Sequence, residues 1–288
     1  DLPIGEKFYS FNLQHPQRRS FITSKLMRVI ISSENQPYND FELVDLTIND
    51  VSLGIYNLEE IYSYKSLAKK TSFPSVVFGF DESFYFEEGS IYERELIDNY
   101  YESIIKPHQP NEVFKNKILL NQFRKASVLL DKFRFKKLST SEVFNIDEIA
   151  TWLAVGDIFG AWHGYHWGNI KFTYDINTNK IYPLIWDTID ENNLASSSSP
   201  NKELNERLFR LNDPYMNPNS VFWKELFSDP KLIKAYMSKL SQFSEDDYIN
   251  KILKSNSKLI NNYIYHLQKY YPQISYDEEI KRINKNIS

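Results

Sequence analysis

The sequence predicts a mixed α+β fold with a small, strand-rich first part and a larger helical second part. Three observations support this prediction. The chain has 288 residues, 42% of them hydrophobic and 25% charged, as in an ordinary globular protein with a substantial core. Residues that alternate like strands concentrate in the first hundred positions, and helical spacing of apolar residues dominates the rest. We therefore expect two lobes, over residues 1–100 and 101–288.

In the first part, residues 7–13 alternate like a short strand, and residues 17–31 place apolar side chains at helical spacing. Residues 41–58 indicate two strands around Asn49 and Asp50, because these two residue types tolerate the positive φ of a tight hairpin. A short helix over 61–70 and a strand over 75–80 follow. The acidic stretch 81–102 is then expected as an insertion in the small lobe.

The second part is mostly helical, with helices expected over 91–105, 111–132 and 146–160. Asn145 is a suitable first residue for the last of these, since Glu148 follows three positions later. Two strands, 170–174 and 180–185, are then expected around a tight turn at 177–179. A polar stretch over 190–205 indicates an exposed loop. The remaining predicted helices lie near 221–227, 229–241, 245–269 and 276–286.

Composition excludes several classes of protein and of site. The chain contains no Cys, so a disulfide scaffold, a thiolate zinc site, an iron–sulfur cluster and a cysteine nucleophile are excluded. Basic residues number 34 against 38 acidic ones, a net charge of −4, which argues against nucleic acid as a partner. No apolar run approaches the ~18 residues of a membrane span. We interpret the basic stretch 115–137, like the acidic stretch before it, as a solvated face.

Residues suited to chemistry concentrate between positions 156 and 187. Four of the 8 glycines stand there at four-residue spacing, among two His and an Asn. The predicted order is helix, polar loop ending in Asn169, hairpin, and then Asp187 at the end of a strand. A loop amide and a strand-end carboxylate brought together by a hairpin make an oxygen-rich pocket suited to Mg²⁺. The same order of elements occurs in the catalytic loop, hairpin and metal-binding Asp of protein kinases.

Several segments also match a known family. They are TINDVSLGIYNLEE at 47–60, FNLQHP at 11–16 followed by Arg19, AWH at 161–163 with Asn169, and the late Asp187. In this order and spacing they resemble the CotH (spore-coat protein H) kinase-like family, in a branch with a G-W-H signature. The resemblance covers most of residues 7–190. It implies an atypical kinase fold of two lobes, whose first two strands would precede Asp1.

The resemblance further implies a site and an activity. The chain would bind ATP with Mg²⁺ or Mn²⁺ and transfer phosphate to a protein Ser or Thr, or to another hydroxyl, so its expected partner is a protein substrate or an assembly partner. The implied site residues are His163 and Asp157 as catalytic residues, Glu59, Glu60, Arg19 and Lys7 for the cofactor, and Asn169 and Asp187 for the metal.

Two departures from the family pattern concern catalysis. His163 stands near the position where members with kinase character have an Asp that orients the acceptor hydroxyl. A neutral imidazole can also accept a proton from a hydroxyl near neutral pH. Residues 17–31 contain no Glu to pair with a strand lysine such as Lys7, so the usual Lys–Glu ion pair of kinases is not expected.

Each site residue also has a structural interpretation. Asp187 would cap a turn, Asn169 would belong to a plain turn, and His163 would be buried between Trp162 and Trp167. Asp157 would lie on the solvent face of its helix. Glu59 and Glu60 would start the helix 61–70, and Arg19 would pair with an internal carboxylate. Two other functions follow from these alternatives. One is a catalytically degenerate kinase-like binding or assembly module, and the other is a hydrolase in which His163, His166 and Asp187 hold Zn²⁺.

Overall fold

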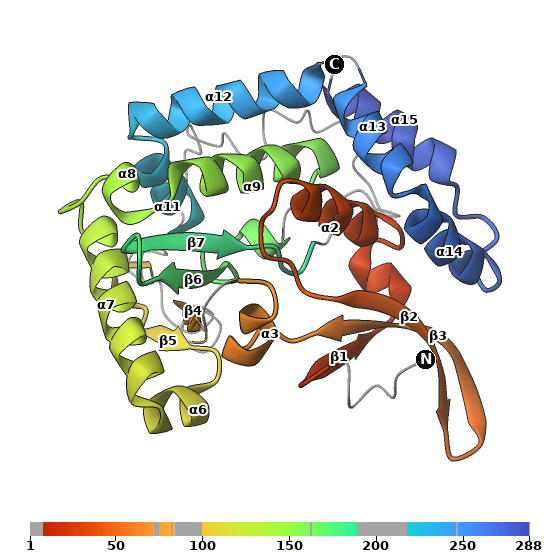
Figure 1. The fold of residues 1–288 in the computed structure, drawn as a ribbon, viewed down its shortest axis with the longest axis horizontal. Coiled ribbons are helices and arrows are strands. Elements are labelled where there is room, and N and C mark those ends of the chain that lie inside the picture. Colours follow the sequence, from red (N-terminus) through yellow and green to blue (C-terminus); the bar gives the residue numbers. More distant parts are fainter. Residues whose placement is uncertain are drawn as a thin grey trace, which may run out of the picture.

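Two antiparallel sheets and a set of surrounding helices make up the structure (Figure 1), a computed structural model that describes residues 8–71, 75–81, 83, 100–161, 163–188, 218–245 and 247–287. In chain order the elements are β1 (Phe11–Gln14), the 3₁₀ turn η1 (Pro16–Arg19), α2 (Thr23–Ser33), β2 (Phe41–Ile48), β3 (Val51–Glu60), α3 (Tyr64–Ala68), β4 (Val77–Phe80), β5 (Ile105–Pro107), α6 (Pro110–Lys115), α7 (Lys117–Arg134), α8 (Thr140–Val143), α9 (Ile146–Phe159), the 3₁₀ turn η2 (His163–Tyr165), β6 (Lys171–Asp175), β7 (Lys180–Leu184), α11 (Pro218–Leu226), α12 (Pro230–Ser244), α13 (Tyr248–Ser255), α14 (Ser257–Gln268) and α15 (Tyr276–Ile287). The predicted α+β class is confirmed.

The first sheet has the strand order β1-β3-β2, and β2 and β3 form a long hairpin that extends from the body of the molecule (Figure 1). Its turn consists of Asn49 and Asp50, with φ of 50° and 63°. These angles are the ones that a tight two-residue hairpin requires, and Asn and Asp tolerate them better than most residues. The predicted hairpin is therefore confirmed, together with the reason for it.

The second sheet has the order β5-β4-β6-β7, so a strand from the first hundred residues pairs with the hairpin of the second part. Thr173 of β6 lies opposite Val77 of β4 and opposite Tyr182 of β7. The β6–β7 hairpin has the predicted place and turn. One hydrophobic cluster extends from Ile22 to Ile283 and includes residues on both sides of position 100. The division into two lobes stays a prediction.

Helix α9 lies at the centre of the helical layer, beneath α12 and close to α2 (Figure 1). Asn145 begins it as predicted, because its side chain accepts hydrogen bonds from the backbone N–H groups of Asp147 and Glu148. Gly160 ends it with a left-handed φ of 62°. The 3₁₀ turn η2 follows directly, so α9 delivers the chain to the loop that carries His163.

Several predicted boundaries are wrong, for local reasons. Pro16–Arg19 form a 3₁₀ turn, and Ser20 and Phe21 have φ of 50°, so the helix begins only at Thr23. The predicted helix 61–70 begins at Tyr64, since Ser63 forms its capping box. The predicted helices 111–132 and 245–269 are each interrupted by an asparagine, at Asn116 and Asn256.

Other predictions fall partly or wholly outside the described residues. Ile105 belongs to β5 and not to the end of a helix 91–105, whose other residues up to 99 are not described. Lys7, Trp162 and the loop 190–205 also lie outside the described residues. The basic stretch 115–137 contains all of α7 and exposes most of its basic side chains, as predicted, but Arg134 is buried and donates to the backbone carbonyls of Tyr100 and Ser103.

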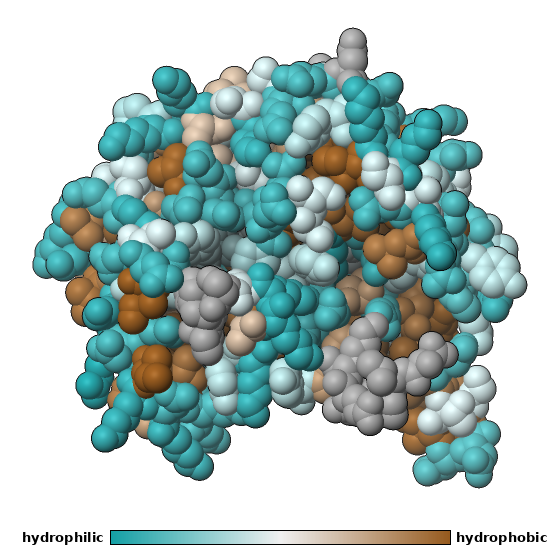
Figure 2. Space-filling model, viewed as in Figure 1, coloured by the Kyte–Doolittle hydropathy of each residue, from teal (hydrophilic) through white to brown (hydrophobic). Residues whose placement is uncertain are grey.

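The surface seen in Figure 2 is hydrophilic over most of its area, and its largest hydrophobic area lies over the first sheet. Exposed apolar side chains on that sheet are Phe11, Leu13, Ile48, Val51 and Leu53. Among the described residues, no helix combines the length and the apolar character needed to cross a membrane.

Candidate active site

Asp187 follows β7 and lies on the loop segment that contacts η2. Its backbone carbonyl accepts a hydrogen bond from the N–H of Gly164, at 2.9 Å. A Cβ atom at Gly164 would lie 1.7 Å from the carbonyl oxygen of Trp186, which is far inside van der Waals contact. Only glycine therefore allows this loop to pass so close to the segment after β7. This close approach is the physical reason for one of the four regularly spaced glycines.

Two further contacts hold the segment around Asp187 in place. The hydroxyl of Tyr62, just after β3, donates to the carbonyl oxygen of Ile185 at 2.9 Å. On the other side of Asp187, the hydroxyls of Thr188 and Ser24 form a hydrogen bond. The segment is thereby attached both to the end of the first sheet and to α2. Asp187 itself has a positive φ of 46°, a conformation that Asp tolerates in tight turns.

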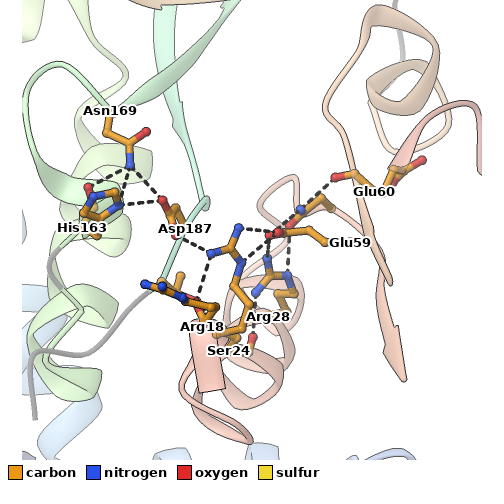
Figure 3. Close-up of polar contacts among 11 residues, drawn as sticks. Arg18, Ser24, Arg28, Glu59, Glu60, His163, Asn169 and Asp187 are labelled. Atoms are coloured by element: carbon orange, nitrogen blue, oxygen red, sulfur yellow. Dashed lines mark hydrogen bonds and ion pairs between the residues drawn. The ribbon is translucent and has the colours of Figure 1, made fainter. Parts of the chain in front are cut away.

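The carboxylate of Asp187 contacts side chains from two other segments of the chain (Figure 3). One oxygen, Oδ2, lies 2.6 Å from Nδ1 of His163 and 3.1 Å from the amide nitrogen of Asn169. The other oxygen, Oδ1, accepts a hydrogen bond from Nη1 of Arg19 at 2.6 Å. Four of the predicted site residues are thus in direct contact. We call His163, Asn169, Asp187 and Arg19 the Asp187 cluster.

Arg19 also connects this cluster to a buried ion-pair network. Its Nε and Nη2 both lie 2.8 Å from Oε2 of Glu59, at the end of β3. The other oxygen of Glu59 accepts from Arg28 of α2 at 2.7 Å. Glu59 is completely buried. Because two guanidinium groups flank it, its charge is compensated in the interior, as a buried carboxylate requires.

This arrangement tests the structural interpretations of Glu59 and Arg19, and their cofactor roles stay predictions. Glu59 ends a strand and pairs with two arginines, so the prediction that it starts the helix 61–70 is wrong. Arg19 does pair with internal carboxylates, as one of its interpretations predicted. An Arg–Glu pair exists beside Asp187 after all, with the acid on the strand and the bases on η1 and α2. Sequence reasoning did not single out Arg28, although a helix without acids was a signal that it supplies the cation.

The electrostatics keep Asp187 ionised. Burial by itself raises the pKa of this carboxyl, but the hydrogen bond from His163 and the positive charge of Arg19 outweigh burial, and Asn169 adds a further donor. The net result is a pKa below the usual value for Asp. The carboxylate can therefore accept hydrogen bonds or ligate a cation throughout the neutral range.

The imidazole of His163 is oriented by Asp187. Its Nδ1 lies 2.6 Å from the carboxylate, which can only accept, so Nδ1–H donates this hydrogen bond, while 43% of the side chain is exposed. In a neutral imidazole with the proton on Nδ1, Nε2 is the nitrogen that accepts. This geometry is the Asp–His arrangement that enzymes use to take a proton from a hydroxyl. The interpretation of His163 as a buried residue is wrong.

The donor set suits Mg²⁺ in its chemistry. Asp187 and Asn169 supply a carboxylate and an amide, but the amide nitrogen donates to Asp187 at 3.1 Å, so the amide oxygen would have to turn toward Asp187 to join it as a ligand. Hard oxygen ligands of this kind hold Mg²⁺ when phosphate oxygens and waters complete the octahedron. Within the described part of the chain, no three His, Asp or Glu side chains form a group that could hold a metal. The zinc site of His163, His166 and Asp187 is therefore not assembled, and that prediction is wrong.

The remaining predicted site residues contact other parts of the molecule. Glu60 is buried, and its carboxylate accepts from the backbone of Asp40 and from Lys70. Asp157 is also buried, so its placement on a solvent face is wrong. Its carboxylate accepts a hydrogen bond from the hydroxyl of Tyr236 in α12, and burial raises its pKa to about 7.

No protein-family model matches the chain. No curated protein matches it either.

Proposed function

We propose that this chain is a kinase-like phosphotransferase of the CotH type, which transfers phosphate from ATP to a protein hydroxyl. The observation that carries the proposal is the convergence of Arg19, His163, Asn169 and Asp187 into one hydrogen-bonded cluster. Arg19 and Asp187 are 168 positions apart in the sequence, yet they form a direct ion pair. Residues for which the family resemblance implies metal, cofactor and catalytic roles are thus in contact with one another.

Asp187 and Asn169 would hold the divalent metal, because they are the ionised carboxylate and the amide of the cluster. A bound Mg²⁺ would neutralise charge on the transferred phosphate. Arg19 has a complementary part in this proposal. Its guanidinium is buried and held by Glu59 and Asp187, so it would position Asp187 and add positive charge beside the phosphates without leaving its protein partners. A Lys–Glu pair fulfils this task in protein kinases.

His163 would accept the proton of the acceptor hydroxyl. As the hydroxyl oxygen forms its bond to the γ-phosphorus of ATP, the bond from that phosphorus to the bridging oxygen breaks, ADP leaves, and the hydroxyl proton passes to Nε2 of the imidazole. The resulting imidazolium is stabilised by Asp187, whose carboxylate lies against Nδ1. Nearly half of the imidazole side chain is exposed, which leaves room for an acceptor to approach.

One observation favours the alternative, a kinase-like binding module without catalysis. Both oxygens of Asp187 already accept hydrogen bonds from protein donors, and one of the donors is the cation Arg19. A cluster closed in this way is stable without a metal. The two functions differ in whether nucleotide binds at all, and the phosphotransferase further requires a divalent cation for that binding.

Calorimetry of ATP binding to the full-length protein, with and without Mg²⁺ or Mn²⁺, separates them. The test variant is Asp187→Asn, which keeps the shape of the side chain and removes its charge. The matched control is Asp175→Asn at the other end of the same hairpin, where the carboxylate accepts hydrogen bonds from the turn and from Tyr182. We expect metal-dependent binding in the wild type and control, weakened at least about tenfold in Asp187→Asn. Absence of binding in the wild type would refute the phosphotransferase and leave the binding module.

A further inference from the structure

The hairpin of β2 and β3 exposes apolar side chains at its end. Ile48 and Val51 lie opposite each other beside the turn, and Leu53 follows on β3. Each of the three is between 46% and 60% exposed. Large apolar side chains that are exposed together, on an element that extends from the body of the molecule (Figure 1), indicate a contact surface. We call Ile48, Val51 and Leu53 the hairpin tip.

The hairpin that carries this tip is acidic. Residues 41–58 contain three acidic residues and no basic one. Asp50 lies in the turn, and Asp45 accepts a hydrogen bond from a neutral tyrosine hydroxyl, so this bond leaves its charge uncompensated. Two cations of the helices beside the hairpin are held elsewhere, since Lys25 donates to the backbone at the start of β2 and Lys269 lies over an aromatic ring of α14. The tip therefore combines apolar side chains with negative charge.

The outer face of α7 has the opposite charge. Helical spacing places four exposed basic side chains on this face, Lys117, Arg124, Lys125 and Lys132. Acids close to them in the structure have partners of their own, because Asp131 pairs with Arg134, and Glu225 of α11 pairs with Lys136. Glu112, the acid of α6, offsets one charge at the beginning of α7. The outer face thus keeps an excess of positive charge.

Apolar side chains lie among these cations. Ile118 and Val128 are 67% and 53% exposed, and they lie about 15 Å apart along the helix axis, at 1.5 Å per residue. Arg124 and Lys125 occupy the helix between them. An element that brings apolar and negative groups together in a narrow tip is complementary to this face.

Charge decides which exposed surfaces of two copies can meet. Two hairpin tips would bring Asp45 and Asp50 of each copy together, and two α7 faces would bring cations together, so both of these pairings are repulsive. An anionic membrane would attract α7 but repel the hairpin. The tip of one copy on α7 of another joins opposite charges and buries apolar side chains of both. The hairpin and α7 lie at opposite ends of the longest dimension of the molecule (Figure 1), so one copy cannot make this contact with itself.

We propose that the hairpin tip docks on the outer face of α7 in a second copy of this chain. The contact uses two different surfaces, so it does not close as a two-fold dimer does, and it can repeat from copy to copy. Neither surface includes the Asp187 cluster. The inference is therefore independent of the phosphotransferase proposal.

Sedimentation velocity of the full-length protein over a range of concentrations, at low and high salt, measures this association. We expect the average mass to rise with concentration beyond that of a dimer, and association to weaken at least about tenfold in high salt, because salt screens the exposed charges. The α7 variant is Lys125→Glu with Lys132→Glu, which should weaken association at least about tenfold. Its control is Lys231→Glu with Lys234→Glu, the same change of net charge on exposed residues of α12, which should alter association less than about threefold.

The hairpin variant is Ile48→Thr with Val51→Thr, which removes apolar side chains and keeps residues that favour strands. This variant should also associate at least about tenfold more weakly than the wild type. An equimolar mixture of the hairpin and α7 variants should form a dimer and nothing larger, since one supplies an intact α7 face and the other an intact tip. Where the threonine variant does not fold by circular dichroism, Asp50→Asn, which the turn tolerates, must weaken association by about threefold.

Several results would overturn the inference. The first is a wild-type protein that stays monomeric at all concentrations, or whose average mass levels off at that of a dimer. Unchanged association of either variant, or a mixture of the two that stays monomeric, would contradict it as well. A monomeric wild type that instead sediments with vesicles of anionic lipid would assign α7 to a membrane and overturn docking on a second copy.

Discussion

Replacing Arg19 with methionine is the most informative perturbation of the buried network. The guanidinium is nearly inaccessible to solvent and contacts two carboxylates, Glu59 through Nε and Nη2 and Asp187 through Nη1. Methionine fills a similar volume without a charge or a donor. The variant therefore removes the interactions of Arg19 and creates little empty space.

The contacts that remain set the size of the effect. Breaking a buried ion pair by removing one partner costs roughly 3–5 kcal/mol when the other charge is left uncompensated. Here Glu59 keeps Arg28 at 2.7 Å, and Asp187 keeps His163 at 2.6 Å. Neither carboxylate is left alone, so we expect Arg19→Met to lower the free energy of unfolding by about 3 kcal/mol, the lower end of that range.

The adjacent Arg18 supplies a matched control, because it is exposed and has the same side chain. Arg18→Met should change stability by less than about 0.5 kcal/mol. Urea denaturation monitored by tryptophan fluorescence measures both variants, and equal slopes against urea would show that the same transition is compared. Equal stabilities of Arg18→Met and Arg19→Met would refute the network as an energetic feature.

Three further perturbations test other parts of the structure. Gly164→Ala should displace the backbone of Trp186, lower the free energy of unfolding by about 1–3 kcal/mol and abolish ATP binding. The control Gly54→Ala is also unfavourable because of its φ of 82°, but it should lower stability only in the hairpin and leave ATP binding intact. Comparable ATP binding by the two variants would contradict the close approach of Gly164 to Trp186. Asp157 has a folded pKa of about 7 against 3.8 unfolded, so its protonated form is favoured by folding and the stability that it contributes is lost as pH rises from about 4 to 7. Asp157→Asn should remove that fall in a pH series of denaturation curves, and a parallel series in both proteins would show that the carboxyl is not buried. Asp187 has a lowered pKa, so its contribution is present above the unfolded value and should be lost as pH falls below about 3.8 in the wild type but not in Asp187→Asn.

Local signals predicted the turns and helix starts well. Asn49 and Asp50 form the hairpin turn, and Asn145 begins α9, because each of these interactions involves residues only a few positions apart. The start of α2 was not predictable in this way. Helical spacing continues back to residue 17, but Ser20 and Phe21 adopt a left-handed φ that no local pattern indicates.

The members of the candidate site were predicted better than their partners. His163, Asn169 and Asp187 could be grouped because a single hairpin connects them. The role of Glu59 depends on which side chains meet it from η1 and α2, and these contacts span 40 and 31 positions. A strand-end glutamate has the same appearance in the sequence whether it binds a ligand or an internal arginine. Only the packing of the first sheet against α2 decides between them.

Under the proposed function, we expect from this network that metal and nucleotide bind together. Arg28, Glu59, Arg19, Asp187 and His163 form a chain of groups in which each carboxylate lies between two donors. A cation at Asp187 would be placed near the positive charge of Arg19, and the repulsion weakens its binding. Phosphate oxygens between the two cations would compensate both charges.

Binding of Mg²⁺ or Mn²⁺ alone should therefore be weak, and ATP should raise the affinity for the metal by at least about tenfold. By thermodynamic linkage, the metal must raise the affinity for ATP by the same factor. Titration of Mn²⁺ followed by electron paramagnetic resonance, with and without ATP, measures the first factor, and calorimetry of ATP measures the second. In Arg19→Met the repulsion is absent, so Mn²⁺ alone should bind more tightly and the coupling should shrink. Tight Mn²⁺ binding to the wild type without nucleotide would show that Arg19 does not oppose a cation at Asp187.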